Sequence, residues 1–150
     1  MGKIIAVVRI RGVQRIRPNA RYSMKHLGLT RKHHCVLIDE KQRQMAVACK
    51  DYVAWGEPTV ETIAELLEKR GRVTGDKLLK DNLPKGFASI QDLAKAVFEG
   101  TAFLSKLKGV KRVFRLHPPK KGFGAIKRAY PKGALGYWKQ DINGLLERMM

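Results

Sequence analysis

Strand-like and helix-like segments alternate over the first 57 residues, and this alternation limits the fold more than any other feature of the sequence. The segment 3–11, with an unbroken apolar run over 4–8, predicts a buried strand. Pro18 suits the first turn of a helix, and Gly28 suits the cap that ends it. A strand over 35–39, a helix over 45–52 and a third strand over 53–57 are expected next. The order β-α-β-α-β predicts a small sheet with both helices on one face.

The second part of the chain, residues 58–150, reads mainly as helix. Apolar stripes predict helices that begin near Pro58, Ser89 and Ile142, and the Ser89 helix has the clearest stripe, which extends to Phe98. A short helix over 76–82 and one strand over 110–117 are also expected.

Residues 120–138 show no periodicity and combine four glycines with Pro131, cations and aromatic rings. We expect a long loop there, ordered by the fold or on binding. The expected fold class is therefore α+β: a β-α-β-α-β sheet domain in a ferredoxin-like arrangement over 1–57, with a mostly helical C-terminal extension over 58–150.

The distribution of charge gives the strongest indication of function. The chain contains 31 Lys and Arg residues against 13 Asp and Glu residues, a formal net charge of +18. Segments 1–38 and 100–140 contain no acid at all, whereas 39–99 is almost neutral. A compact chain with this charge repels itself unless a polyanion binds it, and carboxylates are disfavoured wherever phosphates lie opposite. Nucleic acid is the expected partner, ahead of an anionic membrane surface.

Cys35 and Cys49 both lie in apolar segments, so we expect buried free thiols and a reducing compartment. The apolar run over 4–8 is broken by Arg9 and is too short for a signal peptide or a membrane span. A soluble, cytoplasmic protein is expected.

The first acid-free block contains a dense group of candidate RNA contacts. Arginine donates paired hydrogen bonds to phosphate and stacks on bases. His33 and His34 extend the group; no cysteine or carboxylate close in sequence completes a familiar metal pattern, so no metal site is expected. The candidates are Arg9, Arg11, Arg15, Arg17, Arg21, Lys25, Arg31, Lys32, His33 and His34.

The second acid-free block interleaves cations with glycines and aromatic rings. Glycines let the backbone approach phosphates closely, and rings stack on unpaired bases. At least one ring is expected instead to anchor the segment on the protein's own core. The candidates are Arg115, His117, Lys120, Lys121, Phe123, Lys127, Arg128, Tyr130, Lys132, Tyr137 and Trp138.

Catalytic motifs find little support in the sequence. It contains no Walker, HExxH or CxxC pattern, and Gly122-x-Gly124 is followed by Lys127 where a dinucleotide fingerprint requires a third glycine. A metal-dependent nuclease centre needs clustered carboxylates, which both basic blocks lack. We therefore expect a protein that is not an enzyme, with no cofactor and no small-molecule substrate.

Three segments carry a family resemblance: 3–11, 115–123 and 133–137. They resemble the L-thirty family of large-subunit ribosomal proteins in its longer archaeal and eukaryotic branch, whose eukaryotic members are called L-seven. The resemblance implies a compact β-α-β-α-β domain followed by a branch-specific extension, binding to ribosomal RNA, and no catalytic activity. It also implies RNA contacts at Arg9, Arg11, Arg15, Arg17 and Arg21, and in the segment 117–138.

The function expected is that of a structural constituent of the large ribosomal subunit in the cytoplasm. It would bind ribosomal RNA through two acid-free basic surfaces and lie beside other large-subunit proteins. A DNA-binding architectural protein is the first alternative and would prefer duplex DNA to structured RNA. An RNA-processing enzyme is the second, and its turnover of RNA would depend on an Asp or Glu side chain.

Overall fold

The computed structural model describes residues 3–12 and 14–150. Its first part has the predicted element order and includes a 3-10 helix before α2. The elements are β1 (Ile4–Arg9), α1 (Pro18–Leu27), β2 (His34–Asp39), η1 (Glu40–Gln42), α2 (Arg43–Ala48) and β3 (Val53–Gly56).

The second part contains three helices and three strands. Its elements are α3 (Val60–Arg70), η2 (Leu79–Asp81), α4 (Ile90–Phe98), β4 (Val113–Arg115), β5 (Ala125–Ala129), β6 (Gly133–Tyr137), η3 (Lys139–Asp141) and α5 (Ile142–Met149). Local sequence sets several boundaries: Thr59 and Ser89 accept capping hydrogen bonds from Thr62 and Asp92, and Gly28 ends α1 in the left-handed conformation.

The six strands found among the described residues belong to one sheet in the order β4-β2-β1-β3-β6-β5. β1 is antiparallel to both neighbours, with Val7 opposite Val36 on one side and Trp55 on the other. β6 joins β3 in parallel, and β5 adjoins β6 with an irregular register. The α+β class with a ferredoxin-like arrangement is confirmed, and the second part of the chain enlarges the sheet beyond the three strands of the first part.

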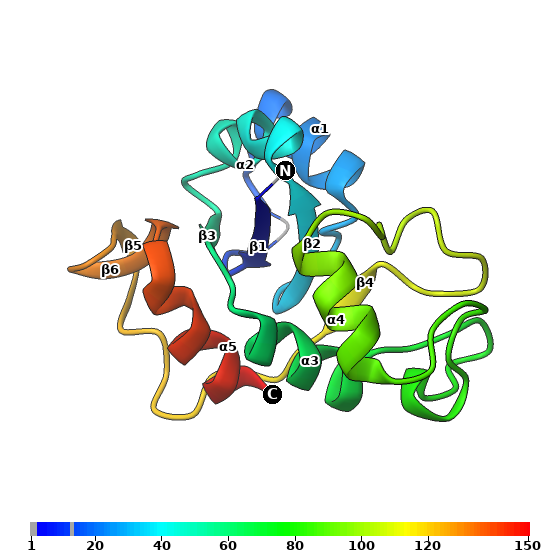
Figure 1. Ribbon diagram of the computed structural model, residues 1–150. Coiled ribbons are helices and arrows are strands. Elements are labelled where there is room, and N and C mark those ends of the chain that lie inside the picture. Colours follow the sequence, from blue (N-terminus) through cyan, green and yellow to red (C-terminus); the bar gives the residue numbers. More distant parts are fainter. Residues whose placement is uncertain (1–2, 13) are drawn as a thin grey trace.

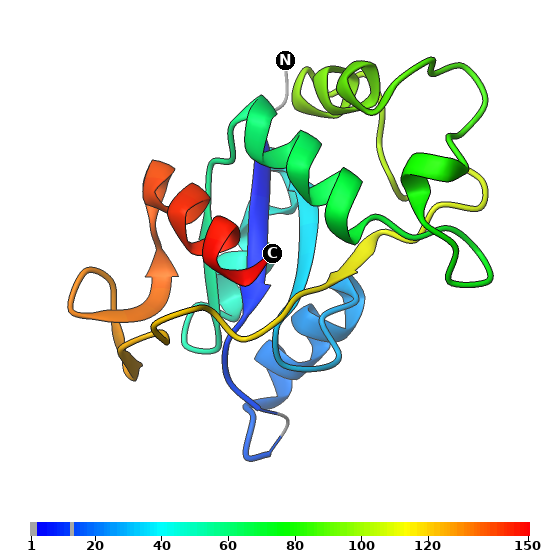
Figure 2. The same cartoon turned by 90° about the horizontal axis from the view of Figure 1, so that it is seen from below.

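Helices cover both faces of the sheet (Figures 1 and 2). α1 and α2 pack on one face against alternate β1 residues such as Ile5 and Val7, which confirms that both early helices share a face. α3, α4 and α5 pack on the other face against Ala6 and Val8. Burial on both faces explains why the 4–8 run is continuously apolar.

The expectation of a loop over 120–138 was wrong, because β5 and β6 lie within it. The strands escaped detection for a physical reason. β5 is exposed or half-buried along its whole length, so it shows no apolar alternation, and β6 includes Gly133 and Gly136, which weaken any strand pattern.

Two further boundaries and the burial of one residue differ from the sequence pattern. The strand expected over 110–117 is only Val113–Arg115, and the helix expected over 45–52 is Arg43–Ala48. Phe98, which fits the apolar stripe of α4, is 43% exposed at the end of the helix instead of packing in the core.

Both cysteines are buried free thiols, as predicted. Burial raises the pKa of Cys35, and it raises that of Cys49 to about 11. Thiolates are the reactive form of cysteine, so neither side chain is a nucleophile near neutral pH.

No helix within the described residues is long and apolar enough to cross a membrane.

The close approach of β3 to the turn before α5 gives the first prediction. A Cβ at Gly56 would overlap the Lys139 carbonyl oxygen and lie 2.8 Å from the Cβ of Ile142. We expect Gly56→Ala to lower the free energy of unfolding by about 1–3 kcal/mol, because the packed backbone must shift. Urea unfolding measures this change.

Gly144 is the matched control, since it lies in α5 with open space where its Cβ would be. Gly144→Ala should raise the free energy of unfolding by roughly 0.5–1 kcal/mol. Equal effects of the two substitutions would contradict the packing described at Gly56.

Candidate nucleic-acid interface

The two acid-free blocks, far apart in sequence, meet at one end of the sheet. β4 pairs with β2 so that Arg115 lies opposite His34. The Leu116 N–H donates to the His33 carbonyl oxygen at 3.1 Å, and the His33 ring stacks on Phe123 with centroids 5.7 Å apart. We call the residues around this junction, 10–12, 14–17, 31–34 and 115–124, the basic surface.

The segment that follows β4 is held in place by the C-terminal helix. The His117 and Lys120 N–H groups donate to the carbonyl oxygens of Met149 and Arg148 at 3.0 Å each. The Arg148 guanidinium donates back to the Gly122 carbonyl oxygen at 3.2 Å. Figure 2 shows the segment passing α5 on its way to β5. The backbone that carries Lys120 and Lys121 is therefore fixed by the fold.

Arg9 lies inside this region and is only 3% exposed. Its guanidinium donates to the carbonyl oxygens of Leu29 at 2.6 Å, Arg11 at 3.0 Å and Gly12 at 3.1 Å. Burial lowers the pKa of Arg9 from its ordinary value. The Arg9 side chain thus positions the backbone that follows β1. Its charge faces backbone carbonyl oxygens, whereas the charges of the exposed candidates face solvent.

This arrangement gives a stability prediction. Arg9→Ala removes three hydrogen bonds and leaves three carbonyl oxygens without this donor. We expect the free energy of unfolding to fall by about 2–4 kcal/mol, since unpaired buried polar groups are expensive. Urea unfolding of the variant provides the measurement.

Arg21→Ala serves as the control, because Arg21 is exposed on α1. A loss of less than about 0.5 kcal/mol is expected there, as at other surface positions. A similarly small loss at Arg9 would show that its hydrogen bonds to the carbonyl oxygens contribute nothing.

Cations surround the buried Arg9 at the surface. Arg11 lies over the Tyr52 ring at 5.3 Å, and Arg17 reaches the Asp51 carboxylate at 4.0 Å with most of its side chain exposed. Such an exposed ion pair contributes little to stability. Arg11 and Arg17 therefore remain available to a polyanion, because little stability is lost when these contacts are given up.

Each sequence candidate can now be placed by its exposure. Arg9 and Trp138 are buried. Arg11, His33, His34, Phe123, Tyr130 and Tyr137 are half-buried. The exposed candidates are Arg15, Arg17, Arg21, Lys25, Arg31, Lys32, Arg115, His117, Lys120, Lys121, Lys127, Arg128 and Lys132.

The candidate aromatic rings all stack on other rings of the protein. Trp138 stacks on Tyr130 with centroids 4.5 Å apart and donates from Nε1 to the Ala134 carbonyl oxygen at 2.8 Å. Tyr137 stacks on Trp55 at 4.5 Å, with Arg43 over both rings. Trp138 is thus the ring that anchors the segment on the core, and the half-buried rings present only part of their surface.

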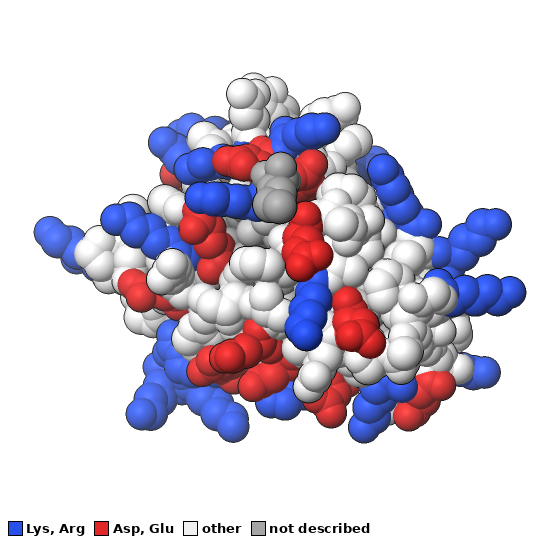
Figure 3. Space-filling model, viewed as in Figure 1, with Lys and Arg blue, Asp and Glu red and all other residues white. Residues whose placement is uncertain are grey.

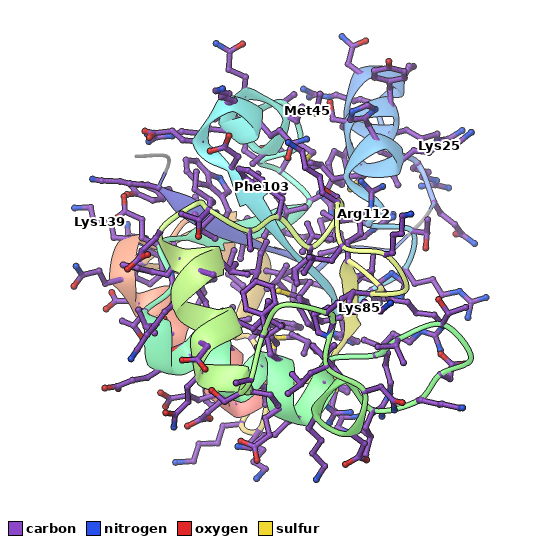
Figure 4. All side chains as sticks on the ribbon, turned by 45° about the vertical axis from the view of Figure 1, so that its right-hand side comes forward. Lys25, Met45, Lys85, Phe103, Arg112 and Lys139 are labelled. Carbon is purple, nitrogen blue, oxygen red and sulfur yellow. The ribbon has the colours of Figure 1, made fainter. Side chains whose placement is uncertain are left out.

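The structure does not gather every candidate into one patch. β4 and β5 form opposite edges of the sheet, so Lys127 and Arg128 on β5 lie far from Arg115 on β4. Lys25 on α1 lies on the same side of the molecule as Arg112, where Figure 4 labels both.

Tyr22 is a functional candidate that sequence reasoning missed. It is 70% exposed and stacks on His26 at 6.3 Å, and Arg112 donates to the His26 carbonyl oxygen at 3.1 Å. An exposed ring among cations suits base stacking. The signal was present in the sequence, because Tyr22 and His26 are four residues apart, away from the apolar stripe of α1.

The surroundings of His33 and His34 favour the neutral forms of both side chains. Burial, and after it Lys32, lowers the pKa of His33; burial, then Arg115 and Arg31, lowers that of His34. Within residues 3–12 and 14–150 no three His, Cys, Asp or Glu side chains gather as metal ligands would.

These shifts predict how stability depends on pH. A lowered histidine pKa in the folded state means that protonation favours the unfolded chain. The contribution of the two histidines to the free energy of unfolding is therefore complete above pH 6.5, the pKa of a histidine in the unfolded chain. It is lost as the pH falls below that value. We expect the free energy of unfolding to decrease as the pH is lowered from neutral through this range.

Replacing both histidines separates their contribution to the pH dependence of the free energy of unfolding from the contribution of the carboxylates. The double variant His33→Gln, His34→Gln should lose stability less steeply than the natural chain over the same range, as measured by urea unfolding at each pH. Identical slopes would mean that neither histidine has a lowered pKa.

Comparison with known proteins gives the class to which this α+β chain belongs. No protein-family model matches it. It is 46% identical to the large ribosomal subunit protein uL30 of Archaeoglobus fulgidus, over 97% of this chain and 99% of that protein. It is 41% identical to proteins of the same name from Staphylothermus marinus, over the full length of both, and from Methanothrix thermoacetophila, over 96% of this chain and 98% of that protein.

The chain therefore belongs to the uL30 family of large ribosomal subunit proteins. The resemblance to the archaeal and eukaryotic branch of the L-thirty family is confirmed over nearly the whole chain.

Proposed function

We propose that this chain is a structural component of the large ribosomal subunit and binds ribosomal RNA through the basic surface. The observation that carries the proposal is the junction of the two acid-free blocks, where Arg115 lies opposite His34 and Phe123 stacks on His33. Membership of the uL30 family supports the same conclusion. Phosphate contacts would supply most of the affinity, and shape would select the site.

The fixed backbone of the basic surface suits folded RNA. Arg9 orders the chain after β1, and α5 holds the segment around Lys120. Both supports exist before any partner binds, so little ordering entropy opposes association. The exposed cations project from this frame, and the half-buried rings offer edges for contact with unpaired bases.

The two alternatives receive less support. Duplex DNA would use the same charges, but the name of the relatives places them in a ribosomal subunit. An RNA-processing enzyme needs a carboxylate at the basic surface. Asp51 and Asp76 lie beside that surface, and each is exposed and pairs with a cation, Arg17 and Lys111 respectively. We expect no catalytic activity, no cofactor and no small-molecule substrate. Ribosomal RNA and neighbouring large-subunit proteins are the expected partners.

The division of the chain at residue 57 stays a prediction. We propose that 1–57 is the unit shared across the family and that 58–150 is specific to the branch. The extension adds β4 and β6 to opposite sides of the earlier sheet and supplies α3, α4 and α5 to one face. It also supplies half of the basic surface.

The salt dependence of RNA binding tests the proposed function. We expect tight binding to a large-subunit ribosomal RNA fragment, weaker binding to duplex DNA, and a steep fall in affinity as salt rises. The double variant Lys120→Ala, Lys121→Ala should reduce the slope of log affinity against log salt by about 0.7–0.9 for each phosphate that is no longer bound. Filter binding over a range of salt concentrations measures it.

Lys95→Ala is the matched control, since Lys95 is exposed on α4, away from the basic surface. It should leave the slope unchanged. A flat salt response, an equal effect of the control, or a preference for duplex DNA would each contradict the proposal, and RNA turnover by the purified protein would favour an enzyme.

A further inference from the structure

A hollow on the face that is turned toward the viewer in Figure 3 combines an apolar lining with acidic side chains. It lies between the start of β1, the turn from β3 to α3 and the end of α4, and has a volume of about 730 Å³. Ile4, Val60 and Phe98 contribute apolar lining, and the carboxylates of Glu57, Glu61 and Glu99 lie around it. We call it the acidic groove.

Phe98 is an unusual residue to find in this position. Its neighbours on α4, Leu93, Ala94 and Val97, are all buried, whereas Phe98 is 43% exposed. Exposed aromatic surface bounded by polar side chains is typical of a contact site for another macromolecule.

The charge of the groove is opposite to that of the whole protein. Glu61 and Glu99 are exposed, and neither forms an ion pair with any residue that the structure describes. Glu57 accepts a hydrogen bond from the Tyr137 hydroxyl at 3.2 Å. Lys3 is the single cation among the described residues that line the groove. Figure 3 shows carboxylates spread over this face from top to bottom, with lysine and arginine side chains both among them and at its margins.

These features exclude RNA as the natural occupant and favour a positively charged one. A phosphate backbone would face unpaired carboxylates, and like charges brought together at an interface are unfavourable. An apolar side chain flanked by cations is complementary to the groove, because the apolar group would pack on Phe98 and the cations would pair with Glu61 and Glu99. The volume lies within the usual range for pockets that enclose a few side chains or a small ligand, roughly 300–1,000 Å³.

We propose that the acidic groove binds a basic segment of a neighbouring protein of the large subunit, through an apolar side chain set between lysines or arginines. The inference goes beyond the proposed RNA binding and rests on it only for the presence of the chain in the subunit. The molecule would thus carry RNA on the basic surface and a protein segment on the acidic groove.

Site-directed photo-crosslinking in assembled large subunits tests the occupant directly. Phe98 is replaced by p-benzoylphenylalanine, and the crosslinked product is identified by mass spectrometry. We expect a protein segment rich in lysine and arginine. A crosslink to RNA, to an acidic or neutral protein segment, or within the chain itself would overturn the proposal, and so would the absence of any crosslink from subunits that contain the chain.

The same photo-reactive residue at Tyr22 is the positional control, because Tyr22 is exposed among cations on α1. It should crosslink to ribosomal RNA. Failure of the chain to enter the subunit would count against the proposed function, whereas a chain that enters the subunit and lacks a basic protein at position 98 would count against the acidic groove alone.

Charge reversal tests the chemistry of the groove. In the chain with the photo-reactive residue at 98, the changes Glu61→Lys and Glu99→Lys together should lower the crosslink yield per incorporated chain by roughly tenfold or more. Glu68→Lys is the control, because Glu68 is exposed on α3 and does not line the groove. An unchanged yield in the double variant would overturn the role of the carboxylates.

Discussion

The antiparallel pairing of β2 with β4 forces two carboxylate-free stretches of chain together, and the basic surface depends on it. The cations at this junction repel one another, but each exposed pair is worth no more than about 1 kcal/mol in salt. Cys35 and Phe114 face each other across the same pairing and are almost completely buried. Burial of a phenylalanine stabilises by about 1.5–3 kcal/mol, so apolar packing beneath the strands outweighs repulsion above them.

The same sheet separates two kinds of surface. One end of it carries the cations of both blocks, and another face carries the groove between Phe98 and the glutamates that surround it. In this chain residues 58–150 supply part of each surface, because β4 adds Arg115 to one and α4 adds Phe98 to the other. The net charge of +18 therefore conceals a separation of basic and acidic surfaces that composition alone does not reveal.

Most of the helices and strands could be predicted from the local sequence. Caps at Thr59 and Ser89 and the turn at Gly28 mark helix boundaries by short-range chemistry, which is why those elements were predictable. β5 and β6 were not predictable in this way. β6 pairs with β3, a partner some 80 residues away, and contains two glycines, whereas β5 pairs with β6 and is exposed or half-buried along its length.

The candidate site divides in the same way. The sequence identified the cations, but it does not distinguish Arg9 from Arg11. In the structure the Arg9 guanidinium is buried against the Leu29 carbonyl oxygen, whereas Arg11 is half-buried. The exposure of Phe98 likewise follows from where α4 ends in three dimensions, since its spacing fits the apolar stripe.

β5 forms an open edge of the sheet, with unpaired backbone groups on its outer side. Such an edge is a template on which a second copy of the chain could add a strand during synthesis, before any RNA is bound. Lys127 and Arg128 lie in the middle of this strand and are exposed. Two copies meeting edge to edge would bring these cations together, and the repulsion between them would oppose such pairing.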